Sequence, residues 1–378
     1  MSSPRAHVCV RVNNTYTADL RVRRAAETLA AAGYRITVVA DRDRAGRLPV
    51  RETLEGVDVV RHSKTSRVPF RSLVDAISAT GADIIHAHDV DSLLPAVLAA
   101  RRMGPATRIV YDSHELWSAH ARDKVHARRR ALVALEGRLL RRCDALITAS
   151  PLYTEEIVRE YGYAGRTQTI LNVPRYWTDA ELTPSWEERD RSSARIVTAV
   201  SVFQHGRGAV PLVRSLQNLP KDVRVRLVGP FPQRDYEALV RETAAPFGER
   251  VELAGSVEPG EIVPTLAASH LSAVLIEPIS RSYELTSPNK LYESLMAGTA
   301  IIGSRYGVIR DVVEQEDAGV VCDPRDPEAI AGAVLEALGD RERLAANARR
   351  AATRYNWDRE RDKLLELFEW LASGADRR

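Results

Sequence analysis

The stretch SPNKLYESLMAGTAIIGS, residues 287–304, decides the fold, because it predicts a helix followed at once by a buried strand. Ser287 is a good N-cap, and Pro288 suits the first helical position because proline lacks an N–H that a helix start leaves unused. Gly298 can end the helix in the left-handed conformation, and residues 300–302 then form the strand. Three apolar residues recur at helical spacing on one face of this helix: Leu291, Leu295 and Met296.

The start of this helix is a candidate anion site. Unpaired N–H groups and the positive end of the helix dipole favour a negative charge there, and Lys290 adds a full positive charge. Glu293, one turn later, can accept hydrogen bonds from a pair of hydroxyls. Together with Ser287 and Asn289 these residues are candidates for binding a nucleotide diphosphate and its ribose. The alternative is a capped amphipathic helix whose Lys and Glu are merely solvated.

The segment PNKLYESLMAG resembles the donor-binding segment of glycosyltransferase family 4, which usually reads P-x-K-x-x-E-x-x-A-x-G-x-P. The resemblance implies that Glu293 holds the ribose of a sugar nucleotide. Many members carry a second Glu eight positions earlier, which contacts the sugar. In this sequence Leu285 stands at that position, with Glu284 beside it, so the sequence departs from the family pattern there.

Length and composition predict a globular chain of two domains, since 378 residues exceed what one core usually supports. Residues 1–180 hold 28 Lys and Arg against 20 Asp and Glu, a net charge of +8, and the remainder carries −5. A basic half of this kind predicts contact with something anionic. Residues 122–142 alone carry eight basic side chains, which favours either a solvated surface helix or peripheral contact with an anionic membrane.

The chain carries no apolar run of membrane-spanning length, and we expect no signal peptide at its start. Cys9, Cys143 and Cys322 lie far apart in apolar contexts without CxxC spacing, which is typical of buried free thiols in a reducing compartment. We therefore expect a cytoplasmic protein, with the inner membrane face as the place of any peripheral contact. No nucleic-acid partner is expected.

The first half alternates strands and helices, beginning with a strand over 7–12 and a polar loop over 13–19 that lacks GxGxxG. The absence of that fingerprint argues against a nicotinamide enzyme. Residues 57–61 are predicted as an edge strand, and residues 170–173 are predicted to close the first sheet. Residues 174–193 are polar and without periodicity, which indicates a domain linker.

Four polar residues are predicted at the carboxyl edge of the first sheet, where open parallel sheets bind ligands: His88, Asp89, His114 and Glu115. The segment DSHELW resembles the family segment in which a His contacts the donor sugar, which implies a catalytic role for His114. The opening unit resembles the family's as well, and its first loop borders the acceptor site. Asp19 and Arg21 are therefore acceptor-side candidates, the alternative for Arg21 being a solvated side chain.

Two runs of strand–helix alternation predict an α/β chain of two Rossmann-like doubly wound domains facing a central cleft, which matches the GT-B architecture. We place the N-terminal, acceptor-side domain at 1–180, the linker at 181–194 and the donor-binding domain at 195–357. The last helix, within 358–378, is expected to pack back on the first domain.

Arg207, in Gly206-Arg207-Gly208, follows the first strand of the second half, where family members carry Arg or Lys before Gly. The planar guanidinium group of Arg207 can donate two parallel hydrogen bonds to a diphosphate. The alternative is that the segment forms an ordinary turn without a binding role. Val257 falls in the region that meets the nucleobase in the family. We expect a transferase that moves a hexosyl group from a nucleoside-diphosphate sugar, UDP favoured over GDP. By resemblance it would act with retention. We expect no metal cofactor, because Arg207, Lys290 and the helix dipole can neutralise the leaving diphosphate instead.

Three other functions stay open from the sequence. Three histidines and three acidic residues near the first sheet's edge could form a metalloenzyme site: His86, His88, His114, Asp89, Asp112 and Glu115. A sugar-nucleotide epimerase can share the two-domain fold, and a non-catalytic module would bind donor without turnover. The acceptor itself is not readable, and a lipid-linked sugar, a polysaccharide end or a small-molecule aglycone would each be compatible.

Overall fold

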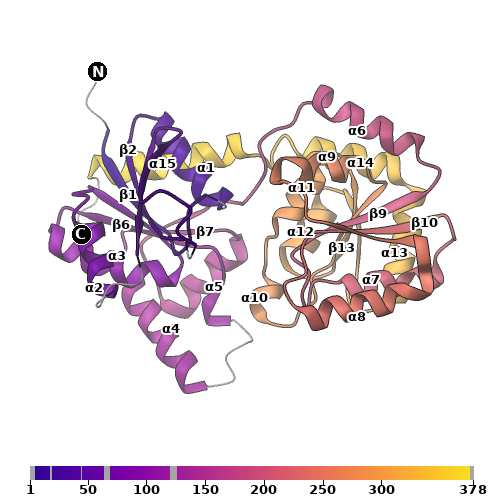
Figure 1. Cartoon of the computed structure of the whole chain (residues 1–378), viewed down its shortest axis with the longest axis horizontal. Coiled ribbons are helices and arrows are strands. Elements are labelled where there is room, and N and C mark those ends of the chain that lie inside the picture. The colour runs from indigo at the N-terminus through magenta and orange to yellow at the C-terminus, as the bar shows by residue number, and fades with distance from the viewer. Residues whose placement is uncertain (1–4, 18, 44, 64–68, 120–125, 375–378) are drawn as a thin grey trace. The chain divides into compact units, whose positions relative to one another are not determined.

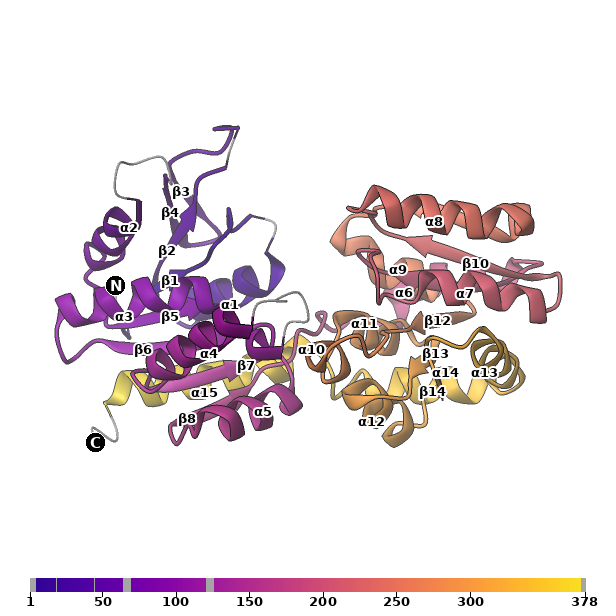
Figure 2. The ribbon, with the colours of Figure 1, turned by 90° about the horizontal axis from the view of Figure 1, so that it is seen from below.

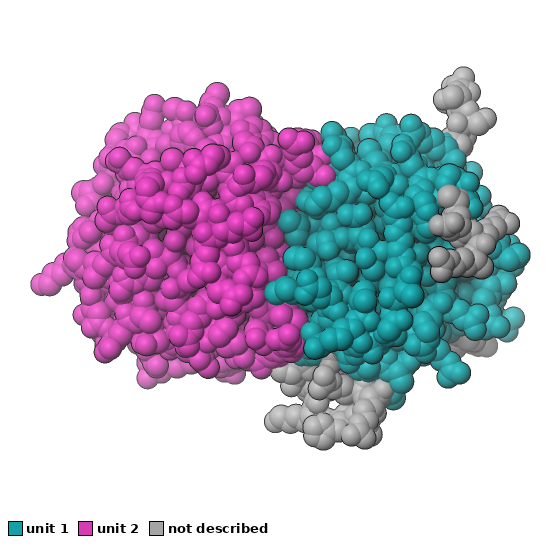
Figure 3. All heavy atoms as spheres, turned by 180° about the vertical axis from the view of Figure 1, so that it is seen from behind, with its two compact units in different colours: residues 1–171, 360–378 teal, residues 172–359 magenta. Residues whose placement is uncertain are grey.

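The computed structural model describes residues 5–17, 19–43, 45–63, 69–119 and 126–374 (Figure 1). The chain divides into two units, which Figure 3 shows in different colours. Unit 1 comprises Met1–Leu171 and Glu360–Arg378, and unit 2 comprises Asn172–Arg359. Each unit is an open α/β sheet with helices on its two faces.

Unit 1 contains the strands β1 (His7–Arg11), β2 (Arg35–Asp41), β3 (Arg51–Leu54), β4 (Val57–His62), β5 (Ile84–His88), β6 (Arg108–Ser113), β7 (Ala145–Thr148) and β8 (Arg166–Thr169). Its helices are α1 (Leu20–Ala31), α2 (Pro69–Ser78), α3 (Val90–Met103), α4 (His126–Leu140), α5 (Pro151–Tyr161) and most of α15 (Trp357–Ser373), and a short 3-10 turn spans Trp117–Ala119.

The sheet of unit 1 has the order β3-β4-β2-β1-β5-β6-β7-β8 among the described strands, which can be followed down the view in Figure 2. Neighbouring strands are parallel except β3 and β4, which are antiparallel. The chain runs outward in one direction from β1 through β2 to β4 and in the other from β5 onward. The order therefore reverses between β1 and β5, which is the point where such sheets bind ligands.

The helix α15 supplies part of the core of unit 1, although it lies at the other end of the sequence. Phe368 is fully buried, and its ring centre lies 5.4 Å from that of His86 on β5 and 6.2 Å from that of Tyr34. Glu360 accepts a hydrogen bond from the backbone N–H of Leu171 at 2.8 Å. In Figure 1, α1 and α15 lie on one face of the sheet and α2, α3 and α4 on the other.

Unit 2 contains the strands β9 (Arg195–Val200), β10 (Val223–Val228), β11 (Val251–Gly255), β12 (Leu271–Val274), β13 (Ala300–Ser304) and β14 (Gly319–Cys322). Its helices are α6 (Asp179–Arg191), α7 (Ala209–Ser215), α8 (Arg234–Ala244), α9 (Ile262–Ala267), α10 (Arg281–Glu284), α11 (Asn289–Ala297), α12 (Gly307–Gln315), α13 (Pro327–Gly339) and α14 (Arg341–Ala351), with 3-10 turns at Leu216–Asn218, Ala245–Arg250 and Pro259–Glu261.

The sheet of unit 2 is parallel throughout, in the order β11-β10-β9-β12-β13-β14. This is the doubly wound order in which the chain reverses between β9 and β12. One apolar cluster joins the strands to α7, α8 and α13, and a second joins α6, α9 and α11, which places helices on both faces (Figure 1). Because both faces are covered, the central strands are almost continuously apolar.

Three predictions about elements are wrong. The expected irregular linker at 181–194 is largely the helix α6, which begins with a reciprocal capping box between Thr178 and Glu181. Residues 57–61 lie in β4, an interior strand, because the unpredicted β3 covers it as the edge. The last strand of the first sheet is β8, Arg166–Thr169, and not residues 170–173.

Candidate functional site

Two loops meet at the strand-order reversal of unit 2. Residues 201–208 leave the carboxyl end of β9, and residues 275–288 leave that of β12 and lead into α11. The backbone N–H of Glu277 donates to the carbonyl of Gly206 at 3.0 Å and joins the two loops. Ser304, at the end of β13, fixes the same region, because its hydroxyl accepts the N–H of Ile276 at 2.7 Å.

The Gly206-Arg207-Gly208 turn is a constrained structure, not an ordinary turn. Gly208 has a φ of 67°, and a Cβ on it would lie 2.6 Å from the carbonyl oxygen of Leu275. Only glycine adopts that conformation cheaply and leaves room for such a close approach. The turn can therefore hold Arg207 at a fixed place beside the loop that leads to α11.

The Arg207 guanidinium lies against an aromatic ring that the sequence analysis did not single out. Its central carbon is 4.7 Å from the ring centre of Tyr283, on α10, and Gln204 donates to the Tyr283 hydroxyl at 2.9 Å. The Arg207 Nε is buried and has no hydrogen-bond partner in the part of the chain that the structure describes. Stacking on a ring holds the guanidinium plane and leaves its N–H edges for an anion.

The helix α11 begins one residue later than predicted. Pro288 is its N-cap, with φ −76° and ψ 142°, and Asn289 is the first helical residue. Ser287 lies one residue outside the helix, because Pro288 is itself extended and takes the N-cap position. Its buried hydroxyl lies 2.6 Å from that of Tyr292 instead. The predicted end is confirmed, since Gly298 is left-handed at φ 64° and ψ 42°.

Lys290 and Glu293 lie on α11 with half-buried side chains, whereas Asn289 is exposed. Burial lowers the pKa of Lys290, Glu293 opposes that shift, and Arg207 lowers it further. Arg207 and Glu293 thus act in opposite directions on the charge of Lys290. Two cations from separate loops repel one another, and an anion between them would relieve the repulsion.

Val257 and Leu285 are the two remaining positions in unit 2 that the sequence analysis discussed for donor binding. Val257 follows β11, two strands away from β9, and is half-buried. Its contact with a nucleobase stays a prediction. Leu285 is buried, and Glu284 forms a partly exposed ion pair with Arg281 at 3.1 Å. The position that carries a Glu in many family members therefore holds an apolar side chain directed into the protein.

In unit 1 the predicted polar residues gather at the reversal between β1 and β5. Asp89 follows β5 with an unusual φ of 60°. One of its carboxylate oxygens accepts the backbone N–H of His114 at 3.0 Å and the Trp117 indole N–H at 3.3 Å. The other lies 3.4 Å from Nδ1 of His114. Burial raises the pKa of Asp89, and His114 opposes the shift. Asp89 thus orients the loop after β6.

His114 also contacts a second histidine. Its Nε2 lies 2.9 Å from Nδ1 of His88, and the side chain of His114 is 19% exposed while that of His88 is 1% exposed. The rings of His86 and His88 lie 4.1 Å apart between centres, since alternate residues of a strand share a face. Burial, helped by His86, lowers the pKa of His88 well below its ordinary value, so its ring is neutral.

Arg21 is buried, so its interpretation as a solvated side chain is wrong, and its contact with an acceptor stays a prediction. Its guanidinium is buried, donates to the carbonyl of Ile170 at 2.8 Å and pairs with Asp112 at 2.8 Å. Burial would raise the pKa of Asp112, but Arg21 and the neighbouring histidines hold it well below its usual range. Asp112, which the sequence suggested only as a metal ligand, is therefore the central carboxylate of this cluster.

His86, His88 and Asp112 each offer a ligand atom, and these atoms lie within 4.8 Å of one another. Such a set resembles a metal site in its residue types. The Arg21 guanidinium, however, already neutralises the Asp112 carboxylate at 2.8 Å and would repel a cation bound there. The cluster fits a buried ion pair beside two imidazole rings better than it fits a metal centre.

The remaining acceptor-side candidates have simpler places. Asp19 is the N-cap of α1 and accepts the N–H of Val22 at 3.1 Å, and Glu115 is exposed beside His114. Of the basic segment, residues 122–125 lie outside the described residues, as do the side chains of 126–130. Arg138 is exposed, and no helix in the described chain has the length and apolar composition needed to cross a membrane.

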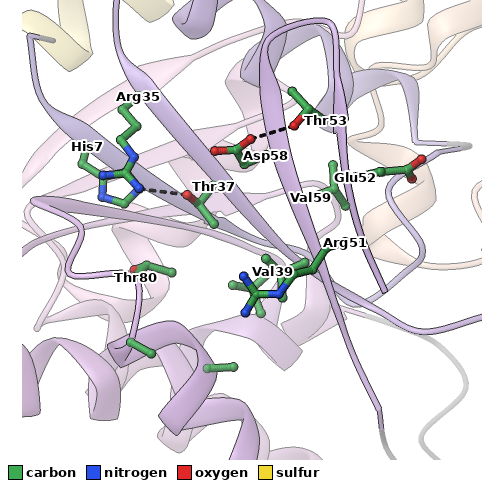
Figure 4. Close-up of a pocket in the computed structure, with 13 residues that line it drawn as sticks. His7, Arg35, Thr37, Val39, Arg51, Glu52, Thr53, Asp58, Val59 and Thr80 are labelled. Atoms are coloured by element: carbon green, nitrogen blue, oxygen red, sulfur yellow. Dashed lines mark hydrogen bonds between the residues drawn. The ribbon is translucent and has the colours of Figure 1, made fainter. Parts of the chain in front are cut away.

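A separate cavity of about 510 Å³ lies between α2 and the strands β1, β2, β3 and β4 (Figure 4). His7 and Thr37 bond to one another at 2.9 Å along its wall, and Thr53 donates to Asp58 at 2.9 Å. Its lining residues do not include His114, Asp112, Arg207 or Lys290. It therefore belongs to neither of the two clusters described above.

Comparison with known proteins identifies both halves of the chain. Residues 18–172 match the sequence profile described as Glycosyl transferase 4-like domain, and residues 195–340 match that described as Glycosyl transferases group 1. A D-inositol 3-phosphate glycosyltransferase of Xylanimonas cellulosilytica is 28% identical over 244 residues, covering 60% of this chain and 56% of that protein. The chain thus spans little more than half the length of that relative. A glycogen synthase of Mycobacterium tuberculosis is 26% identical over 76% of this chain and 66% of its own.

Solved structures show the same fold. The sucrose-phosphate synthase of Thermosynechococcus elongatus aligns with a TM-score of 0.80 at 22% identity, over 98% of this chain and all of that chain. Anabaena HepE, solved in complex with UDP-glucose, aligns with a TM-score of 0.76 at 16% identity, over 96% and 99%. The predicted GT-B fold and the family resemblance are both confirmed.

Proposed function

The chain belongs to the glycosyl transferases group 1 family, and on that premise we propose that it transfers a hexosyl group from a nucleoside-diphosphate sugar to an acceptor hydroxyl. UDP is the favoured nucleotide, and HepE, captured with UDP-glucose on the same fold, supports that choice. Retention of the anomeric configuration follows from the family resemblance. The free buried cysteines favour a cytoplasmic enzyme.

The observation that carries the proposal is that the loop of Arg207 is bonded to the loop that leads into α11, and that Arg207 stacks on Tyr283 of that second loop. The helix α11 then supplies Lys290 in its first turn. Glycosyl transfer passes through an oxocarbenium-like transition state in which negative charge grows on the leaving diphosphate. Two fixed cations and the positive end of a helix can neutralise that charge, so no metal cofactor is required. Ser287 and Val257 are proposed to border this donor site, with Asn289 beside the phosphates.

Glu293 is proposed to accept hydrogen bonds from the ribose hydroxyls, and His114 to contact the transferred sugar. In this account Asp89 is a positioning residue, because it holds the backbone and the ring of His114. His88 bonds the other ring nitrogen of His114 and, being neutral, can share a proton with it without adding charge.

Calorimetry with UDP and 2′-deoxy-UDP tests the role of Glu293. The unchanged protein should bind UDP more tightly, and Glu293→Ala should lose about tenfold or more in UDP affinity while binding the two nucleotides alike. Glu314→Ala, an exposed change on the neighbouring helix α12, is the matched control and should keep both affinities. Unchanged discrimination in Glu293→Ala would contradict the assigned role.

Turnover separates the transferase from the other functions. UDP release that depends on an acceptor and persists in EDTA supports a metal-independent transferase. Interconversion of the sugar nucleotide without acceptor would identify an epimerase instead. Loss of activity in EDTA with recovery on adding a divalent metal would remove the metal-independent part of the proposal.

A further inference from the structure

The cavity of about 510 Å³ in unit 1 has no role in the proposed sugar transfer, since none of the residues assigned to the donor or the acceptor lines it. His7 and Arg35 are in its wall and are the first residues of β1 and β2, and Thr80, also in its wall, precedes β5. These residues lie at the amino end of the parallel strands. His114 follows the carboxyl end of β6, which is the opposite edge of the sheet.

The cavity exists because short side chains line it on the side of α2. Ala76 on α2, with Ala79 and Thr80 in the turn after it, are lining residues. On the side of the sheet, Val39 and Val60 add apolar surface. A cavity of this volume, with apolar walls and a few polar groups, is typical of small-molecule sites, which measure roughly 300–1,000 Å³.

The strand register arranges the polar groups of the lining in a definite pattern (Figure 4). Thr37 on β2 is directly opposite Asp58 on β4, and Arg35 precedes Thr37 by two residues. Arg51 on β3 is opposite Val60, which follows Asp58 by two residues. Alternate residues of a strand share a face, so the two arginines flank the Thr37–Asp58 pair on the face that lines the cavity.

The two arginines supply positive charge that the fold does not neutralise. Arg35 and Arg51 are exposed, and their guanidinium groups form no ion pair or hydrogen bond with the described residues. Glu52 also lines the cavity, but it pairs with Arg61 at 2.5 Å. The described lining therefore carries two unpaired positive charges against the carboxylate of Asp58, and a net positive cavity favours an anionic ligand.

Two buried polar side chains of the wall have hydrogen-bonding capacity to spare. His7 and Thr37 are 9% and 8% exposed, and Nε2 of His7 lies 2.9 Å from the Thr37 hydroxyl. Nδ1 of His7 makes no hydrogen bond to any described residue. Burial, helped by the charge of Arg35, lowers the pKa of His7, so its ring is neutral at pH 7. A polar atom of this kind in a cavity wall is available to a ligand.

We propose that this cavity binds a small phosphorylated polyol, of the sugar phosphate class, as a second ligand of unit 1. Arg35 and Arg51 supply the charge and the paired N–H donors that suit a phosphate. Asp58, Thr37 and His7 suit hydroxyl groups, because they offer acceptors and neutral donors. An anion without hydroxyls would meet the Asp58 carboxylate with nothing to donate to it, so the polyol part is needed as well as the phosphate.

Calorimetry with the full chain in excess UDP, which occupies the proposed donor site, tests the proposal. The probes are glucose 6-phosphate, fructose 6-phosphate and glycerol 3-phosphate, and the reference ligands are glucose and inorganic phosphate. At least one probe should bind at one site per chain, about tenfold or more tightly than either reference ligand.

Substitutions in the lining locate the site. Arg35→Ala and Arg51→Ala should each weaken binding of that probe about tenfold or more, because each removes charge-assisted hydrogen bonds. Arg71→Ala, an exposed change on α2 outside the lining, is the matched control and should leave binding unchanged. Asp58→Asn should reduce the preference for the probe over inorganic phosphate, because it removes the charge that repels a bare anion. All four proteins should keep their affinity for UDP.

The outcomes are separate from those of the proposed function. The proposal is overturned if no probe binds in the millimolar range, or if neither arginine substitution weakens binding, because the ligand would then lie elsewhere. Inorganic phosphate that binds as tightly as every probe would overturn the polyol assignment. A chain that binds a probe through these arginines but does not bind UDP would leave this proposal standing while the proposed function fails.

Discussion

Removing the Asp112 carboxylate should destabilise unit 1 strongly, because it leaves the Arg21 guanidinium buried without its counter-charge. The two side chains are 3% and 7% exposed and bond at 2.8 Å. Taking one partner out of a buried ion pair costs about 3–5 kcal/mol, most of it the penalty of the charge that remains. For a unit of this size each kcal/mol lowers Tm by about 2–4 °C, so Asp112→Ala should lower the transition of unit 1 by roughly 6–20 °C.

Differential scanning calorimetry at pH 7 measures this transition, and the two units can be followed as separate steps if they unfold independently. The matched control is Glu27→Ala, which breaks the Arg23–Glu27 pair on the same helix as Arg21. That pair is about one-third exposed on both sides, so its loss should cost no more than about 0.5 kcal/mol. The double change of Arg21 and Asp112 to apolar residues should recover much of the loss, because no buried charge is left.

The reasoning is refuted if Asp112→Ala costs less than about 1 kcal/mol, or no more than the control. Such a result would mean that water or a rearranged side chain solvates Arg21 in the folded protein. The cluster would then be a hydrated pocket, and the orientation of His86 and His88 would not depend on Asp112.

Three further predictions concern donor binding, the constrained turn and pH. Arg207→Ala should weaken UDP binding, measured by calorimetry, about 10–150-fold, because charge-assisted hydrogen bonds to the diphosphate are lost. The control Arg214→Ala, an exposed change on α7, should not weaken UDP binding. An Arg207→Ala protein that binds UDP as tightly as the unchanged protein would remove Arg207 from the site. Gly208→Ala should lower the free energy of unfolding in urea by at least about 1 kcal/mol, because Gly208 has a φ of 67° and lies close to the Leu275 carbonyl. The control Gly332→Ala, whose added Cβ meets nothing within 4 Å, should not destabilise the protein. An unchanged free energy of unfolding in Gly208→Ala would contradict the constraint inferred for this turn. Folding lowers the pKa of His88, so the neutral ring contributes its full stability above the ordinary pKa of 6.5, and this stability is lost as the pH falls below 6.5. The Tm of unit 1 should therefore decrease when the pH is lowered below 6.5. A Tm that stays constant over that pH range would count against a buried neutral ring.

Several features followed from local sequence. The last helix, predicted within 358–378, is α15 at Trp357–Ser373, and its apolar spacing is regular. The end of α11 at Gly298 and the strand after it, β13, also follow from turn chemistry and a short apolar run. These elements depend on residues within one or two turns of each other, so their pattern is visible in the sequence.

Features that depend on distant partners were not predictable. The linker prediction failed because α6 is polar on most of its surface and buries only Leu182 fully. Tyr283 was missed because a single aromatic in a short segment carries no sign of the Arg207 guanidinium that lies over it. Ser287 was misassigned as the cap because the sequence does not show that Pro288 stays extended and takes that position itself.

The sequence by itself determined the family, the two α/β halves and the segment that begins near Pro288, because these are carried by periodicity and by residues a few positions apart. Only the tertiary structure decided what the charges do. Arg21 and Asp112 lie 91 positions apart and form a buried pair, so the charge of Arg21 is neutralised inside the fold. A charge count sums over the chain, whereas binding depends on which charges remain unpaired at a surface, and that is set by the fold.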